Sequence, residues 1–169
     1  SLKRFVTDKV YSQPRQPLEP VPQTHPERVA VIGAGPCGLT AAQDLARDGY
    51  AVTVFEALPV AGGMLRVGVP EYRLPATIIE REVADITDLG VELRLNTRVD
   101  DLDGLFDQGF SAVLIAVGAH EGVRLPIPGA DLEGVLMNTR FLRDVRVGGP
   151  PALGRRVLVL GGGNVAIDV

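Results

Sequence analysis

Two glycine-rich turns hold the residues whose types and spacing could do chemistry. The first contains Gly33, Gly35 and Gly38, directly after the apolar run at residues 29–33. In such a Gly-x-Gly-x-x-Gly pattern, the first glycine permits a tight turn and the second lets backbone approach a pyrophosphate. The third lets the following helix pack closely on the strand. Because the positive end of that helix then faces the phosphates, the pattern predicts a dinucleotide site.

An acidic residue, Glu56, follows the turn by about 20 residues, as the fingerprint requires. It ends a second apolar run at residues 51–55. A carboxylate there accepts hydrogen bonds from the ribose hydroxyls and repels a 2′-phosphate. We therefore expect FAD or NAD at this site rather than NADP. The alternatives are a glycine turn that serves packing alone and an acid that is merely exposed at a strand end.

A second turn repeats the pattern as Gly161, Gly163 and Ala166, after the apolar run at residues 157–160. It predicts the opening of another dinucleotide site. The residue that distinguishes NAD from NADP follows about 20 residues after such a turn, beyond Val169. The sequence therefore leaves this choice open.

No catalytic constellation and no metal site is predicted. His25 lies in a proline-rich segment and His120 in a loop, apart from any cluster of acids. The single cysteine, Cys37, adjoins the first turn at a helix N-terminus, a setting that raises thiol reactivity, but a small packing residue is the favoured interpretation. One thiol forms no internal disulfide and holds no iron–sulfur cluster. Hydride transfer between a nicotinamide and a flavin needs no protein nucleophile, so an oxidoreductase remains the leading hypothesis.

The elements around these turns alternate between strand and helix, which predicts an α/β, Rossmann-like parallel sheet. We expect the lead-in at residues 1–28 to be extended, because prolines crowd its second half. The first segment of an FAD-binding domain follows at 29–128, then a connection at 129–154 and the start of an NAD(P)H-binding domain at 155–169. The expected strands are residues 29–33, 51–55, 91–95, 110–117 (buried) and 157–160, and the expected helices are 36–47, 76–89, 102–109 and 139–147, with a helical turn at 2–6.

Composition excludes several classes of protein. The chain has 169 residues, of which 46% are apolar and 22% charged, with a net charge of -4. These values are typical of a globular chain, and the absence of a basic block argues against nucleic acid as a partner. The longest apolar run, residues 112–117, is too short to span a membrane. A cytoplasmic location is expected, since the one cysteine fits a reducing compartment.

Four segments together resemble a known family. They are residues 62–75 (GGMLRVGVPEYRLP), the first turn at 33–38, Ile127-Pro128-Gly129, and the second turn at 161–168. In order and spacing they are similar to the glutamate synthase small (beta) subunit family, which includes the flavin part of dihydropyrimidine dehydrogenase. The resemblance implies an FAD domain interrupted by an NAD(P)H domain. Electrons would pass from NADPH or NADH through FAD to an iron–sulfur domain or subunit, or to a large glutamate synthase-type subunit.

The resemblance also implies roles for individual residues. Gly33, Ala34, Gly35, Pro36, Cys37 and Gly38 would line the FAD pyrophosphate, and Glu56 would hold the ribose. Gly63, Met64 and Arg73 would fix the long loop and the cofactor, and Val99 would contact the adenine side through its backbone. Ala116 and Gly118 would lie where a strand end passes the FAD, while Gly162, Gly163, Asn164 and Val165 would meet the NAD(P)H pyrophosphate.

Family members carry a cysteine-rich iron–sulfur region before a segment like residues 2–5 and continue well beyond a position like Val169. The resemblance therefore implies an N-terminal FAD-domain fragment that binds FAD weakly by itself. Residues 157–169 are expected to fray or to pair with another copy. Two alternatives remain open: an NAD-dependent dehydrogenase that uses the first site for NAD, and a non-catalytic nucleotide-binding scaffold that makes subunit contacts.

Overall fold

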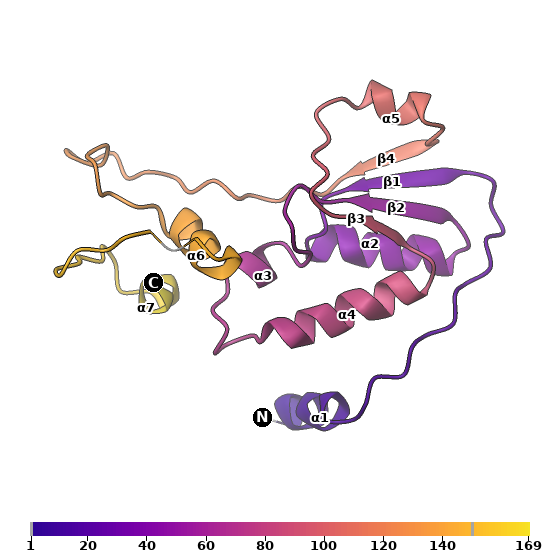
Figure 1. The fold of residues 1–169 in the computed structure, drawn as a ribbon, viewed down its shortest axis with the longest axis horizontal. Helices are drawn as coiled ribbons and strands as arrows, with labels where there is room; N and C mark the ends of the chain where they lie inside the picture. Colours follow the sequence, from indigo (N-terminus) through magenta and orange to yellow (C-terminus); the bar gives the residue numbers. More distant parts are fainter. Residues whose placement is uncertain (1, 150) are drawn as a thin grey trace.

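A four-stranded parallel sheet organises the chain (Figure 1). The structure is a computed structural model that describes residues 2–149 and 151–169. The strands are β1 (Arg28–Ile32), β2 (Ala51–Phe55), β3 (Glu92–Arg94) and β4 (Ala112–Ile115), in the order β3-β2-β1-β4. In register, Val29 of β1 lies beside Val52 of β2 and Ala112 of β4. Because β1 lies between β2 and β4, the order reverses there, as in a doubly wound fold. The predicted α/β class is confirmed.

Helices cover both faces of this sheet. On one face α2 (Pro36–Arg47) and α4 (Ala76–Asp88) pack on the valines at alternate positions of β1 and β2. On the other face, α5 (Asp103–Asp107) supplies Leu105, which packs with Ile32, Phe55 and Phe110. Every position of β1 and β2 after the first is thus buried on one side or the other, and all of these residues except Thr53 are apolar, as is typical of parallel strands. Pro36 occupies the first turn of α2, where its missing N–H has no intrahelical partner to lose.

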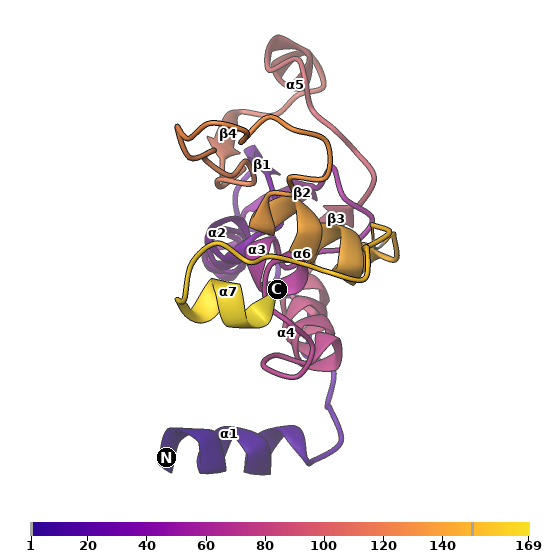
Figure 2. The ribbon, with the colours of Figure 1, turned by 90° about the vertical axis from the view of Figure 1, so that its left-hand side faces the viewer.

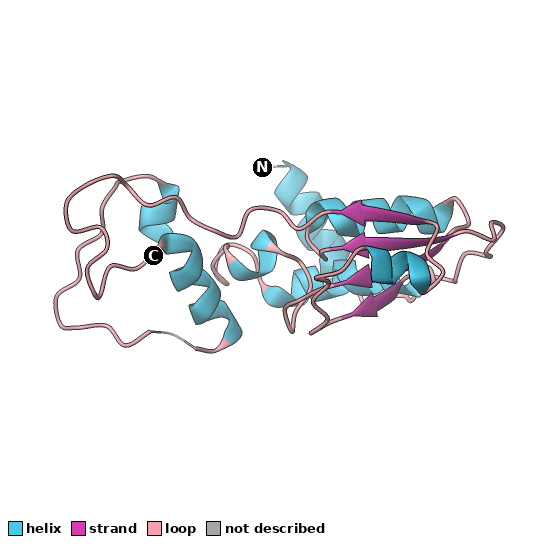
Figure 3. Cartoon of the chain, turned by 90° about the horizontal axis from the view of Figure 1, so that it is seen from above, coloured by secondary structure: helices cyan, strands magenta, loops and turns pink. Residues whose placement is uncertain are grey.

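Three further helices lie beyond the carboxyl ends of the strands. In Figure 3 the strand arrowheads point toward α3 (Met64–Val67), α6 (Asn138–Val147) and α7 (Asn164–Asp168). Of these, α3 falls in the segment expected to be a loop. This part of the molecule therefore holds both glycine-rich turns and the long loop between β2 and α4.

The N-terminal helix α1 (Leu2–Tyr11) extends past the single helical turn that the sequence predicts. It lies apart from the sheet, next to α4 (Figure 2). Arg81 of α4 donates a hydrogen bond to the Tyr11 carbonyl oxygen at 3.2 Å, and Arg15 pairs with Asp85 and Asp88. Residues 14–25 contain no helix or strand, in agreement with the prolines there.

Two strand predictions need correction. Residues 157–160 form no strand, and Leu158 is 83% exposed, because no described strand lies beside them to accept their hydrogen bonds. The segment at 110–117 contains β4, but β4 is an edge strand and Ile115 is 58% exposed. The apolar character of both segments had indicated burial. In the described parts of the chain, no helix is long and apolar enough to cross a membrane.

Replacing Gly38 with alanine is expected to destabilise the sheet–helix contact. A Cβ at this position would lie 2.0 Å from the Gly33 carbonyl oxygen, which is backbone and has little freedom to move. Overpacking of this kind costs about 1–3 kcal/mol. Chemical denaturation should show that loss for Gly38→Ala and none for Gly149→Ala, where nothing lies within 4 Å of an added Cβ. Equal stabilities of the two variants would contradict the close approach.

Candidate functional site: two glycine-rich turns at the carboxyl ends of the strands

The first glycine turn lies where the ends of three strands meet. Gly33 directly follows β1 and has a φ of +107°, which favours glycine. Its N–H donates to the Phe55 carbonyl oxygen at 2.8 Å, and a Cβ added to it would lie 2.5 Å from the Ala116 carbonyl oxygen. The chain after β4 therefore passes directly against the turn after β1, and no side chain can separate them.

The loop between β2 and α4 covers the same turn with backbone. The Gly62 N–H donates to the Ala34 carbonyl oxygen at 2.7 Å. A Cβ added to Gly63 would lie 2.7 Å from Gly35 Cα, and Gly63 has a φ of +53°. A Cβ added to Gly35 would meet only Gly63 Cα, at 3.8 Å. The two glycine segments thus lie together and keep bulky side chains away from the start of α2.

The start of α2 is suited to bind an anion. Gly35 is its N-cap residue, and no side chain caps the helix there. The first N–H groups of a helix have no acceptor within it, and the helix dipole makes this end positive. Cys37, in the first turn, is exposed. Residues 33–38 are therefore brought together as a backbone surface suited to phosphate.

Glu56 is buried at the end of β2, with 8% of its surface exposed. Its Oε2 accepts the Ala34 N–H at 2.8 Å and its Oε1 accepts the Leu58 N–H at 2.8 Å. The interpretation of Glu56 as an exposed strand-end acid is therefore wrong. Since a carboxylate has about four acceptor positions, two remain for other donors such as ribose hydroxyls.

The other expected residues of the first site lie around this centre. Val99 packs on the cluster that contains Phe55 and Ala30. Ala116 packs partly on the opposite cluster, and Gly118 has a φ of +67° with open space around it. Met64 starts α3, and its side chain lies against Gly68. The structure therefore places Ala116 against the turn and Met64 directly after Gly63, which lies on it, whereas Val99 belongs to an apolar cluster and Gly118 is accessible.

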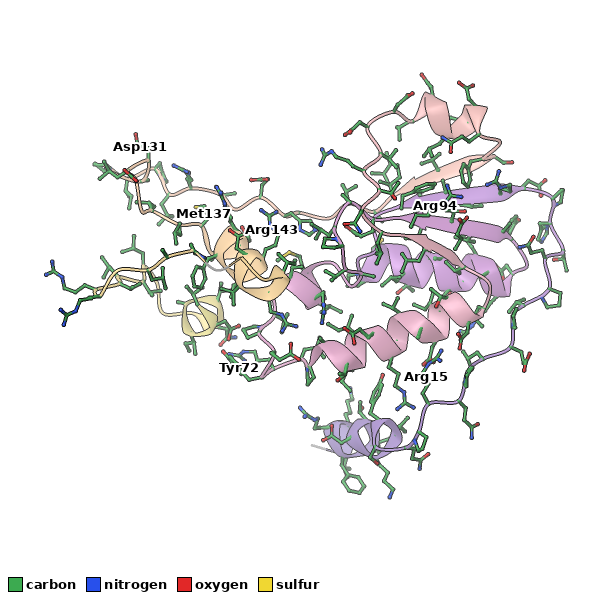
Figure 4. All side chains as sticks on the ribbon, in the orientation of Figure 1. Arg15, Tyr72, Arg94, Asp131, Met137 and Arg143 are labelled. Atoms are coloured by element: carbon green, nitrogen blue, oxygen red, sulfur yellow. The ribbon has the colours of Figure 1, made fainter. Side chains whose placement is uncertain are left out.

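The second turn has a different setting. Nothing lies within 4 Å of a Cβ added to Gly162 or Gly163, and Asn164 and Val165 open α7. The residue that fixes α7 is Asp168, which the sequence did not single out. Its Oδ1 accepts the Tyr72 hydroxyl at 2.8 Å and the Arg73 Nε–H at 2.5 Å. Tyr72 lies on the loop next to α7 (Figure 4).

Hydrogen bonds and the charge of Arg73 favour the ionised form of Asp168 in this contact. Burial alone would raise the pKa of Asp168, but hydrogen bonds from Tyr72 and Arg73 and the Arg73 charge lower it below its usual value. The hydrogen bond to Asp168 raises the pKa of Arg73. Arg73, expected at the cofactor by resemblance, thus binds Asp168 through Nε. No sequence pattern links residues so far apart in the chain.

Arg146 of α6 holds the same long loop from another side. Its Nε donates to the Arg66 carbonyl oxygen at 2.9 Å, and its Nη1 pairs with Glu71. The other Glu71 oxygen accepts the Ala76 N–H at 2.8 Å, at the start of α4. The Arg146 side chain is 10% exposed, and its buried Nη2 has no partner among the described residues. Glu71 therefore joins α4 to α6.

Other features of the surface lie away from this centre. A shallow hollow of about 410 Å³ is lined by residues that include His25, Arg28 and Glu92. It lies at the amino ends of the strands, opposite the glycine turns. Across the described residues, no three His, Cys, Asp or Glu side chains gather to hold a metal ion. The glycine turns remain the site that the structure supports.

Comparison with known proteins identifies the family. Residues 27–169 match the model of the pyridine nucleotide-disulphide oxidoreductases. The chain belongs to this family. Its fold is similar to that of Mycobacterium tuberculosis FprA in complex with NADPH. That structure aligns with a TM-score of 0.70 at 29% identity, covering 85% of this chain and 35% of FprA.

Curated relatives confirm the resemblance drawn from residues 62–75. The beta subunit of an NADP(+)-dependent formate dehydrogenase from Moorella thermoacetica is 44% identical over 99% of the chain. The glutamate synthase [NADPH] small chain of M. tuberculosis H37Rv is 39% identical over 95%. The Escherichia coli NAD-dependent dihydropyrimidine dehydrogenase subunit PreT is 37% identical over 99%. The chain spans 27%, 35% and 41% of these three relatives, respectively.

Removing the charge of Glu71 is expected to loosen the long loop in a pH-dependent way. Its pKa lies below the usual 4.5, mainly through the Ala76 N–H and then through Arg146. A lowered carboxyl pKa adds stability that is complete above the unfolded pKa and disappears as the pH falls through the folded one. Glu71→Gln should therefore lower the Tm near neutral pH and match the original protein at pH values below the folded pKa. A Tm difference that persists in acid would contradict this.

Proposed function

We propose that the chain is the FAD-binding segment of an NAD(P)H-dependent flavin oxidoreductase, with the first turn as the FAD site. The observation that carries the proposal is the joint placement of Gly33, Gly35, Gly63 and Glu56 at one edge of the sheet. Backbone lies where a pyrophosphate would approach, and a buried carboxylate lies where the ribose would follow. Membership of the oxidoreductase family supports this assignment.

The residues present fit FAD. Added Cβ atoms at Gly33 and Gly63 would lie within 3 Å of neighbouring backbone, so the close approach of these segments around the turn exists only because of glycine. The N–H groups at the start of α2 would bind the pyrophosphate, and the free acceptor positions of Glu56 would bind the ribose hydroxyls. The bound flavin supplies the redox chemistry. The protein binds it and orients it at the carboxyl edge of the sheet.

We infer that the second turn opens the pyridine nucleotide site. Gly162 and Gly163 have open space beside them, which suits the close approach of a phosphate. The relatives from Moorella and M. tuberculosis are named for NADP(+) or NADPH, and the E. coli relative for NAD. The chain's own nucleotide is therefore proposed as NADPH or NADH without a choice between them.

The proposed electron acceptor is a partner. Each of those three relatives is named as a subunit or chain of a larger enzyme. We propose that electrons pass from NAD(P)H through FAD to an iron–sulfur domain or subunit, a large glutamate synthase-type subunit being one candidate. The single cysteine, Cys37, supports a reducing, cytoplasmic setting for this exchange.

Glu56→Arg is expected to weaken FAD binding by about tenfold or more, since hydrogen bonds to a charged group contribute about 1.5–3 kcal/mol. The first measurement is the flavin absorbance of the intact protein after FAD is added and unbound FAD is removed. Fluorescence titration then gives the Kd of each variant. Glu133→Arg, at an exposed position, is the matched control and should bind as the original protein does.

Each outcome distinguishes the candidate functions. The proposal is supported if the protein retains flavin, if NAD(P)H reduces that flavin, and if the electrons then pass to an artificial acceptor. NAD bound in place of flavin would favour the dehydrogenase alternative. Binding of either cofactor without any reduction would favour the scaffold. An unchanged FAD affinity in Glu56→Arg would show that this carboxylate does not hold the ribose.

A further inference from the structure

A polar contact joins the two glycine-rich turns. Tyr72 and Arg73 lie on the loop that covers the first turn, and Asp168 lies on the helix that follows the second. Helix α7 contains no buried residue, so hydrophobic packing does not set its position. The contact at Asp168 therefore has a large share in placing α7.

The geometry of this contact is specific. The Tyr72 hydroxyl and the Arg73 Nε–H both donate to Oδ1 of Asp168, at 2.8 and 2.5 Å. The Asp168 side chain is only 13% exposed, although α7 as a whole is near the surface. Asp168 lies just over one helical turn beyond Gly163, so holding its side chain also holds the second glycine turn.

The loop that makes the contact is itself anchored. Glu71 binds the start of α4 and Arg146 of α6, and Arg146 also binds the Arg66 carbonyl oxygen. Nearer the start of the loop, the Gly62 N–H donates to the Ala34 carbonyl oxygen, and the Ala34 N–H donates to the Glu56 carboxylate. A continuous series of hydrogen bonds and covalent links thus runs from the first site to the residues that hold α7.

We propose that Tyr72 and Arg73 are positioning residues that fix the second nucleotide site relative to the first through Asp168. This inference rests on the proposed function, in which a hydride passes between the two cofactors. Such a transfer requires reacting atoms about 3–3.5 Å apart, so a small displacement of one site slows it steeply.

Hydrogen exchange in the intact protein without nucleotide tests the contact directly. In α7, the N–H groups of Ala166 and Ile167 bind the Gly163 carbonyl oxygen, and that of Val169 binds Val165. Asp168→Asn and Tyr72→Phe should speed exchange at these amides by about fivefold, as expected for the loss of an exposed charged contact. Unchanged exchange in both variants would overturn the inference.

Matched controls remove the same chemical groups elsewhere. Tyr11→Phe deletes a hydroxyl that makes no hydrogen bond to a described residue, and Asp131→Asn neutralises an exposed acid on a turn. Neither should change exchange in α7. If either control speeds it as much as its partner variant does, the effect is general and the inference fails.

Rapid-mixing reduction of the bound flavin by saturating NAD(P)H tests the positioning role. In Asp168→Asn the rate should fall by about tenfold while flavin content stays unchanged, and Asp168→Glu should restore part of it. Faster exchange with an unchanged reduction rate would overturn the positioning role. Absence of bound flavin in the full-length protein would instead overturn the proposed function, and the exchange measurement would still decide whether the contact holds α7.

Discussion

The close approach of backbone at the first glycine turn is the constraint on which the other features of the site depend. Gly33 contacts the chain after β4, Gly38 brings α2 onto the turn, and Gly63 lies on Gly35. At each of these contacts, the glycine has no room for a Cβ. Strand ends, helix start and loop therefore meet around a surface of peptide groups, and peptide N–H groups are the donors that a pyrophosphate needs.

Burial of Glu56 follows from the same arrangement. A carboxylate inside a protein must be hydrogen-bonded, and the turn supplies the Ala34 N–H while the start of the next loop supplies that of Leu58. Glu56 thus stabilises the turn and keeps acceptor positions for a ribose. In the proposed site one side chain would serve both fold and binding, so the effect of Glu56 on cofactor affinity must be separated from its effect on stability.

The sequence predicted the parts of this arrangement that depend on local patterns. Apolar runs at β1 and β2, the proline at the start of α2 and the glycine spacing each have a short-range physical cause. The apolar run at 157–160 was misleading because a strand also needs a neighbour, which periodicity does not report. The contacts of Asp168 and Arg146 were missed because a charge carries no signal of a partner that lies 70 or more residues away in the chain.

The two turns are consequently held by different forces. The first is enclosed by backbone contacts that tolerate almost no movement. The second has open space beside its glycines and is attached through Asp168 and the side chains of one loop. Steric contacts are insensitive to salt, whereas exposed charged contacts weaken as ionic strength rises. The first site is therefore rigid by construction, and the position of the second depends on charges that solvent reaches.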